Sequence, residues 1–133
     1  MPTEAKVEEI LRKHLKEHGF TVKERTSRHG VDVTALKDGK TYYVEVEGNT
    51  KPDGQPLTAS QKYTHLLRAV GQTCLRMNDD PDGVFELVLA EDEYYREVIS
   101  KLQTSLKKLD VKAYFIMSNG RVVDFPSKIS GIL

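Results

Sequence analysis

The stretch HGVDVTALKDGKTYYVEVEG, residues 29–48, decides the fold. Its alternating apolar residues predict two strands, and the Asp-Gly pair at 38–39 predicts the tight turn of a β-hairpin. Asp32 lies on the first strand, and Glu45 and Glu47 lie on the second. Because side chains two apart on a strand point to the same face, Glu45 and Glu47 share a face. We therefore expect the hairpin to bring three carboxylates toward one edge of a sheet.

Converging carboxylates repel one another, which raises their pKa values unless a cation neutralises them. Oxygen ligands alone suit Mg²⁺ or Mn²⁺, and such ions commonly serve phosphate chemistry. Two plainer interpretations stay open. Asp32 can be a solvated residue at a strand end, since Asp is a poor strand former. The pair Glu45 and Glu47 can lie on a side of the strand that faces solvent.

The rest of the chain predicts an α/β protein with the order αβββαβαββ, in which helices cover both faces of a central mixed sheet. One domain spans residues 1–133. Apolar spacing, caps and turn residues predict helices at about 3–18, 60–77 and 92–109, and further strands at 20–25, 84–90, 111–117 and 122–125.

The long helix at 60–77 carries two opposed stripes. We expect an apolar stripe to face the sheet: Tyr63, Leu66, Leu67, Val70 and Cys74. We expect a polar ridge on the other side: Gln61, His65, Arg68, Gln72 and Arg76. This ridge is either a solvated face or a nucleic-acid contact.

Composition narrows the class of protein. The chain has 133 residues, 38% of them hydrophobic and 30% charged, with no net charge. No apolar run is long enough for a membrane span, and we expect no contact with a membrane. No signal peptide is visible, and the lone Cys74 rules out an internal disulfide or a cysteine-based zinc site. We expect a cytoplasmic protein.

A helix and strand, VEEILRKHLKEHGFTVKER, precede the hairpin, and together these residues resemble the PD-(D/E)xK restriction-endonuclease-like superfamily. The likeness covers about residues 5–48 and is greatest to archaeal Holliday-junction resolvases. It implies a restriction-endonuclease-like three-layer sandwich and cleavage of DNA by a homodimer, with branched and linear substrates both left open. It also implies that Asp32 and Glu45 bind the metal and that Glu8 is the glutamate of the first helix. Without the resemblance, Glu8 is an ordinary boundary residue that pairs with Arg12.

One residue departs from the family signature. Where the family has Lys two positions after the glutamate, this chain has Glu47, which reverses the charge. Three interpretations follow. Glu47 acts on water or metal in an active Glu-x-Glu site, another lysine such as Lys51 or Lys62 reaches the site, or the fold binds without cutting.

The favoured hypothesis is a Mg²⁺- or Mn²⁺-dependent DNA endonuclease. The alternative is an inactive nuclease-fold module that binds nucleic acid or protein, and an RNA substrate also stays open. The expected catalytic residues are Glu8, Asp32, Glu45 and Glu47, the last three of which also bind the metal. The expected contacts to nucleic acid are Arg25, Arg28, His29, Lys51, Arg68 and Gln72. The first three belong to the loop RTSRHG, which can equally be a solvated loop.

Overall fold

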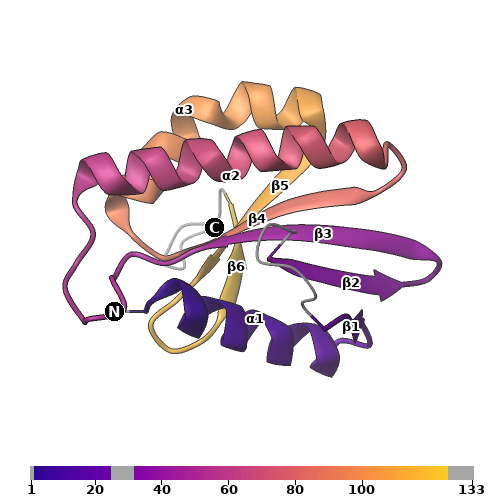
Figure 1. Ribbon diagram of the computed structural model, residues 1–133, viewed down its shortest axis with the longest axis horizontal. Helices are drawn as coiled ribbons and strands as arrows, with labels where there is room; N and C mark the ends of the chain where they lie inside the picture. The colour runs from indigo at the N-terminus through magenta and orange to yellow at the C-terminus, as the bar shows by residue number, and fades with distance from the viewer. Residues whose placement is uncertain (1, 25–31, 126–133) are drawn as a thin grey trace.

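The computed structural model describes residues 2–24 and 32–125. Within these residues, three helices and six strands follow one another in the predicted order αβββαβαββ (Figure 1). They are α1 (Glu4–Glu17), β1 (Thr21–Val22), β2 (Val33–Lys37), β3 (Lys40–Glu47), α2 (Ala59–Asp79), β4 (Val84–Ala90), α3 (Glu93–Leu109), β5 (Val111–Ile116) and β6 (Val122–Asp124).

The strands form one mixed sheet in the order β1-β2-β3-β4-β5-β6. β1, β2 and β3 are antiparallel, β3, β4 and β5 are parallel, and β6 returns antiparallel to β5. The hairpin turn falls at Asp38 and Gly39, whose φ angles of 53° and 77° are those that a tight turn between twisted strands requires. This hairpin and the predicted mixed sheet are confirmed.

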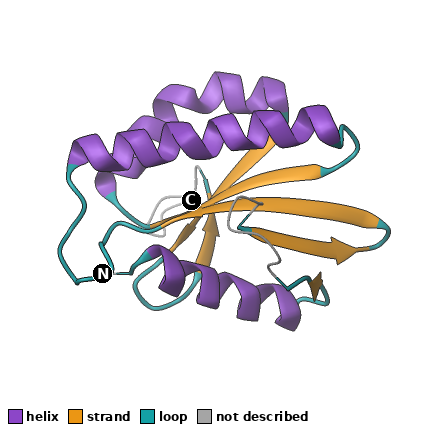
Figure 2. Ribbon diagram, in the orientation of Figure 1, coloured by secondary structure: helices purple, strands orange, loops and turns teal. Residues whose placement is uncertain are grey.

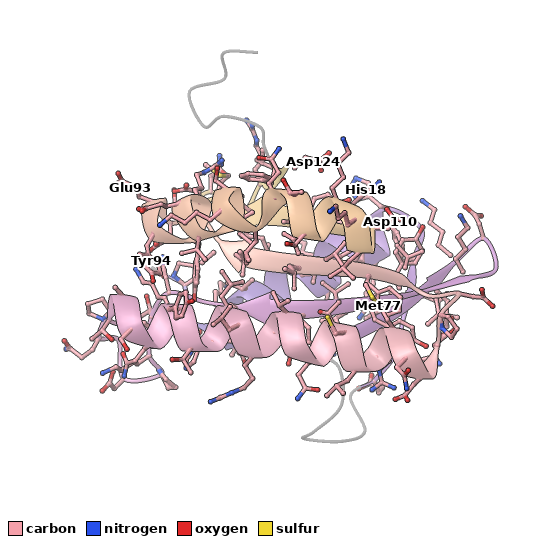
Figure 3. All side chains as sticks on the ribbon, turned by 90° about the horizontal axis from the view of Figure 1, so that it is seen from above. His18, Met77, Glu93, Tyr94, Asp110 and Asp124 are labelled. Carbon is pink, nitrogen blue, oxygen red and sulfur yellow. The ribbon has the colours of Figure 1, made fainter. Side chains whose placement is uncertain are left out.

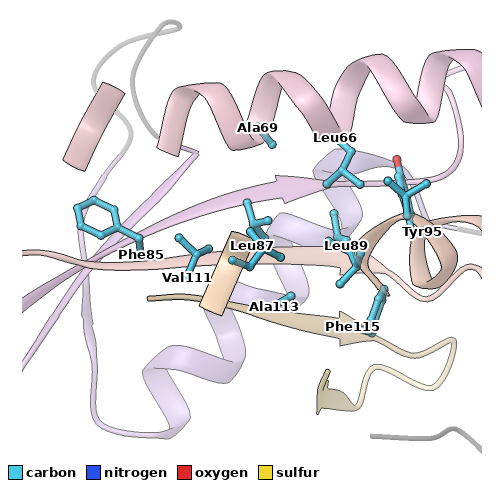
Figure 4. Packing of buried hydrophobic residues seen from close by; sticks show 12 residues of the cluster. Leu66, Ala69, Phe85, Leu87, Leu89, Tyr95, Val111, Ala113 and Phe115 are labelled. Carbon is cyan, nitrogen blue, oxygen red and sulfur yellow. The ribbon is translucent and has the colours of Figure 1, made fainter. Parts of the chain in front are cut away.

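The sheet separates two apolar clusters, so the molecule has three layers (Figure 2). α1 covers one face through Val7, Leu11 and Leu15, and α2 and α3 cover the other. β4 contributes to both clusters, with Leu87 and Leu89 on the α2 side (Figure 4) and Val88 on the α1 side. It is therefore a strand buried on both faces, as its apolar run predicts.

Local capping sets where the helices begin. The hydroxyl of Thr3 accepts a hydrogen bond from the Lys6 amide at the start of α1, as predicted. Thr58 and Gln61 form a reciprocal capping box on α2, and the carboxylate of Asp92 accepts from the first amides of α3. These caps fix where each helix begins, and the start of α1 sets the position of Glu4.

Two sequence predictions about the elements are corrected. β1 has only two residues, and β2 begins at Val33, so Asp32 lies just before the strand instead of inside it. Asp is a poor strand former, and its side chain here takes the place of a backbone acceptor, as described below.

The predicted core stripe of α2 is also wrong in part. Leu66 is buried and Val70 packs against the core, but Tyr63 and Leu67 are 48% and 41% exposed, and Cys74 is exposed. The helix instead buries the small residues Ala69 and Thr73. Burial of Thr73 leaves no unmet hydrogen bond, because its hydroxyl donates to the Ala69 carbonyl at 2.8 Å.

None of the helices in the described ranges combines the length and the apolar character needed to cross a membrane.

Candidate metal centre

The two glutamates of β3 lie under α2. Val44 and Val46 pack on the α1 side of the sheet, so the intervening Glu45 and the following Glu47 point to the α2 side. Each is only 8% exposed. The predicted pairing of these side chains on one face is thus confirmed, but the face is covered instead of open to solvent.

Asp32 lies beside these glutamates because its side chain forms a hydrogen bond with the backbone of β3. Its Oδ2 accepts from the Val46 amide on β3 at 2.9 Å. The side chain thereby completes the pairing of β2 with β3 one residue beyond the end of β2. With 8% exposure, Asp32 is buried beside the β3 glutamates and is not a solvated strand end.

Glu4 also lies near these carboxylates, although no pattern in the sequence indicated it. Thr3 and Thr50 form a short parallel bridge, and the Asn49 amide donates to the Pro2 carbonyl at 3.1 Å. The start of α1 therefore lies directly against the end of β3, as Figure 1 also shows.

Gly48 makes this close approach possible. A Cβ atom at this position would lie 2.3 Å from the Glu4 amide nitrogen and 2.4 Å from the Thr3 carbonyl carbon. No side chain fits there without moving the backbone. Gly48, directly after Glu47, is therefore the signal in the sequence that another backbone segment, the start of α1 with Glu4, comes this close to β3.

One carboxylate oxygen from each of Glu4, Asp32 and Glu47 lies within 4.8 Å of the other two. Burial, followed by the charges of Glu4, Asp32 and Glu45, raises the pKa of Glu47 from its ordinary 4.5 to about 9. Glu45 is outside this group of three but close enough to act on Glu47. Glu47 therefore keeps its proton at neutral pH when no cation is bound.

The donor set fits a hard divalent ion. Mg²⁺ binds oxygen at about 2.0–2.1 Å, so two of its ligands lie at most about 4.2 Å apart. The spacing in the cluster, within 4.8 Å, exceeds that limit by at most about 0.6 Å, which small side-chain rotations can close. Glu4, Asp32 and Glu47 are thus the residues able to hold such an ion, with Glu45 beside them.

Glu8 lies one turn after Glu4 and belongs to a different contact. Its Oε2 accepts from Arg12 Nε at 2.9 Å, the pairing raised as the plainer interpretation. Arg12 also donates to the carbonyls of Lys23 at 2.9 Å and Asp32 at 3.2 Å. The Glu8–Arg12 pair therefore holds the backbone of Asp32, which gives it a part in positioning the cluster.

A cavity of about 670 Å³ opens beside the cluster. Glu4, Glu47, Lys51 and His65 line it, and its volume is within the range of small-molecule sites. Nδ1 of His65 lies 3.6 Å from Oε1 of Glu47. Burial, with a smaller contribution from Arg68, lowers the pKa of His65, so this contact joins two neutral groups at neutral pH.

The basic residues that the sequence suggested for the site lie in different parts of the structure. Lys51 lines the cavity, while Lys62 donates to Oδ2 of Asp92 at 2.7 Å and is committed to the cap of α3. Arg68 and Gln72 are exposed on α2, and the charge of Arg68 acts on Glu47. Arg25, Arg28 and His29 lie outside the described residues.

Comparisons with known proteins give a fold and no family. No protein-family model matches the chain, and no curated protein matches its sequence. The fold is similar to that of an XisH family protein from Nostoc punctiforme PCC 73102, with a TM-score of 0.59 and 13% sequence identity. The alignment covers 87% of this chain and 94% of that chain.

At 13% identity this likeness concerns the fold alone. The acidic cluster lies at the end of the antiparallel hairpin where it meets the parallel strands, which is where the sequence places Asp32 and the two glutamates.

Proposed function

We propose that the protein is a metal-dependent endonuclease that hydrolyses phosphodiester bonds of DNA. One observation carries the proposal: three carboxylates from separate segments lie within 4.8 Å of one another at the edge of a cavity. The pKa of Glu47, raised to about 9, indicates that this cluster disfavours negative charge without a cation. A divalent ion would remove that penalty.

In this proposal Asp32, Glu47 and Glu4 hold Mg²⁺ or Mn²⁺, and Glu45 lies beside them as a further acidic ligand. The bound ion would lower the pKa of an attacking water and neutralise charge on the phosphate. Lys51, on the cavity wall, would contact phosphate oxygens. His65 is neutral and can take up a proton at the ring nitrogen that does not face Glu47.

The substrate is the part of the proposal that rests on the resemblance. Branched DNA and a symmetric dimer follow from the likeness to junction resolvases. Arg25, Arg28 and His29 would add phosphate contacts next to Asp32 in the sequence. Arg68 and Gln72 would extend these contacts along α2.

A second function is favoured by one observation. Glu47 occupies the position of the family lysine, and Lys62, which could replace it, is bound to Asp92 with only 15% of its side chain exposed. A nuclease fold that binds nucleic acid or protein without cutting would tolerate this loss.

The experiment is cleavage of labelled four-way junction, linear duplex and single-stranded DNA with Mg²⁺ and with Mn²⁺. We expect the native chain to cut, and Asp32→Asn and Glu47→Gln to lose cutting. Glu9→Gln is the control, because this carboxylate lies on the outer side of α1 with 70% exposure.

Glu47→Lys separates the two functions, because it restores the family signature. If Glu47 binds the ion, this variant loses activity. If the native chain is inactive and Glu47→Lys gains activity, the chain is a binding module in which the site was lost at this residue.

A further inference from the structure

The outward side of α2 is almost free of charge. Eight of its exposed residues fall within an arc of about 120° at 100° per residue. They are Ser60, Tyr63, Thr64, Leu67, Gly71, Cys74, Leu75 and Asn78, and we call them the outer face of α2. All of α2 is described, and its only exposed charged residues, Arg68 and Asp79, flank this face on one side.

The other two helices show what a solvated face of this protein looks like. The exposed residues of α1, apart from Ala5 and the Glu4 of the acidic cluster, are all charged: Lys6, Glu9, Lys13, Lys16 and Glu17. Half of the exposed residues of α3 are charged: Glu93, Glu97, Lys101, Lys107 and Lys108. The outer face of α2 therefore departs from the pattern of the molecule itself.

This face also exposes large apolar side chains. Tyr63 is 48% exposed, Leu67 41% and Leu75 64%. Met77 of the same helix points toward the sheet (Figure 3), so α2 has apolar residues on both sides. A continuous apolar stripe on one outward helix face is typical of a surface that binds another protein.

Gly71 lies at the middle of the stripe, and no contact within the described chain requires glycine there. A Cβ atom at this position would meet nothing within 4 Å. Glycine inside a helix costs about 1 kcal/mol relative to alanine. A glycine on an apolar face lets the backbone of a second helix approach closely, and that is the role we assign to it.

We propose that the outer face of α2 binds the same face of a second copy of this chain, with the two helices antiparallel and a two-fold axis near Gly71. Leu67 and Leu75 lie four residues before and four residues after Gly71. The antiparallel arrangement therefore sets Leu67 of each copy at the level of Leu75 in the other. The surface is complementary to itself, as an interface with two-fold symmetry requires.

Charge selects the antiparallel arrangement. Arg68 and Asp79 flank the same side of the face. In an antiparallel pair, two-fold symmetry places that side of one helix beside the same side of the other. Antiparallel helices then bring Arg68 of each copy toward Asp79 of the other and oppose the two helix dipoles. In a parallel pair with two-fold symmetry this side of the two copies lies on opposite flanks, so the opposite charges do not meet.

The test is sedimentation equilibrium over a series of concentrations. We expect the native chain to rise with concentration from 15.1 kDa toward twice that mass. A symmetric interface contains the substitution Leu67→Lys twice, once from each copy. We therefore expect this variant to weaken association at least about tenfold. Leu109→Lys is the matched control, because Leu109 has the same 41% exposure but lies at the end of α3.

Thermal melts of both variants at low concentration check that the fold is intact. A native chain that stays at 15.1 kDa at every concentration would overturn the proposal. So would equal weakening by Leu67→Lys and Leu109→Lys, because the interface would then not involve α2.

Cys74 supplies a second measurement. It is exposed, three residues from Gly71, so the two copies of Cys74 lie about 9 Å apart along the helices. A short bismaleimide should join them in the native chain and fail to do so in Leu67→Lys. A dimer that is not cross-linked through Cys74 would place the interface elsewhere. None of these outcomes depends on chemistry at the acidic cluster.

Discussion

Replacement of Glu47 by Gln is expected to change how the stability of the metal-free protein depends on pH. Glu47 is 8% exposed, and burial and three neighbouring acids raise its pKa from 4.5 to about 9. The folded state therefore keeps this proton up to about pH 9, whereas the unfolded chain loses it near pH 4.5. Between these values the unfolded state binds fewer protons, so the free energy of unfolding falls as pH rises.

The slope of this contribution is at most about 1.4 kcal/mol per pH unit. From pH 6 to pH 8 the native chain should thus lose about 2–3 kcal/mol more than Glu47→Gln, whose side chain does not titrate. For a chain of this size that corresponds to roughly 3–5 °C in Tm per kcal/mol. His14 and Glu86 also titrate with shifted pKa values, but they are present in both proteins and are not among the groups that act on Glu47, so they cancel in the difference.

The assay is urea unfolding with a chelator present, at several pH values from about 5.5 to 8.5, for the native chain, Glu47→Gln and Glu9→Gln. The exposed control, Glu9→Gln, should run parallel to the native chain. If Glu47→Gln also runs parallel to it, the proton is not held at Glu47 and the electrostatic account of the cluster is wrong.

Three further predictions concern the residues around the cluster. Gly48→Ala should cost at least about 1–3 kcal/mol and abolish stabilisation by Mg²⁺, measured as Tm with and without the ion, because the new Cβ drives Glu4 away; an unchanged response would contradict the close approach. Glu4→Gln should weaken Mg²⁺ binding in calorimetry more than Glu8→Gln does, and the reverse order would make Glu8 the helix ligand. Lys62→Met should cost about 1–3 kcal/mol in urea unfolding, because the Asp92 carboxylate loses its lysine partner and keeps its hydrogen bonds to the first amides of α3; lost cleavage at unchanged stability would instead identify Lys62 as the missing catalytic lysine.

Local patterns predicted most of the fold because they act over a few residues. The turn at Asp38-Gly39 needs only its own backbone angles, and the Thr3 cap needs only the first turn of α1. The apolar run of β4 has one stable place, inside a sheet covered on both faces. Each of these features is set by neighbours in the sequence.

The orientation of α2 could not be predicted in the same way. Its sequence holds two apolar stripes at helical spacing, and Leu66 is buried while Leu67 is exposed. Periodicity does not distinguish a stripe that packs on the sheet from one that binds a partner. The decision depends on the small residues Ala69 and Thr73, which let the helix approach the sheet closely.

The part of the acidic cluster that belongs to the β2–β3 hairpin was predicted from the sequence. Asp32 and Glu47 come together because β2 and β3 are adjacent strands. Glu4 joins them only because the start of α1 returns to the end of β3 at Gly48, a contact between distant segments. Glu4 and Glu8 lie one turn apart on the same helix side, so sequence spacing alone does not choose between them.

The most direct test of the central claim is to locate a bound ion by anomalous diffraction from crystals soaked in Mn²⁺. The account predicts one peak within bonding distance of carboxylate oxygens from Glu4, Asp32 and Glu47, and loss of that peak in Asp32→Asn. A peak that avoids these three residues, or no peak in crystals that retain this fold, would contradict the metal centre and with it the proposed hydrolysis of DNA.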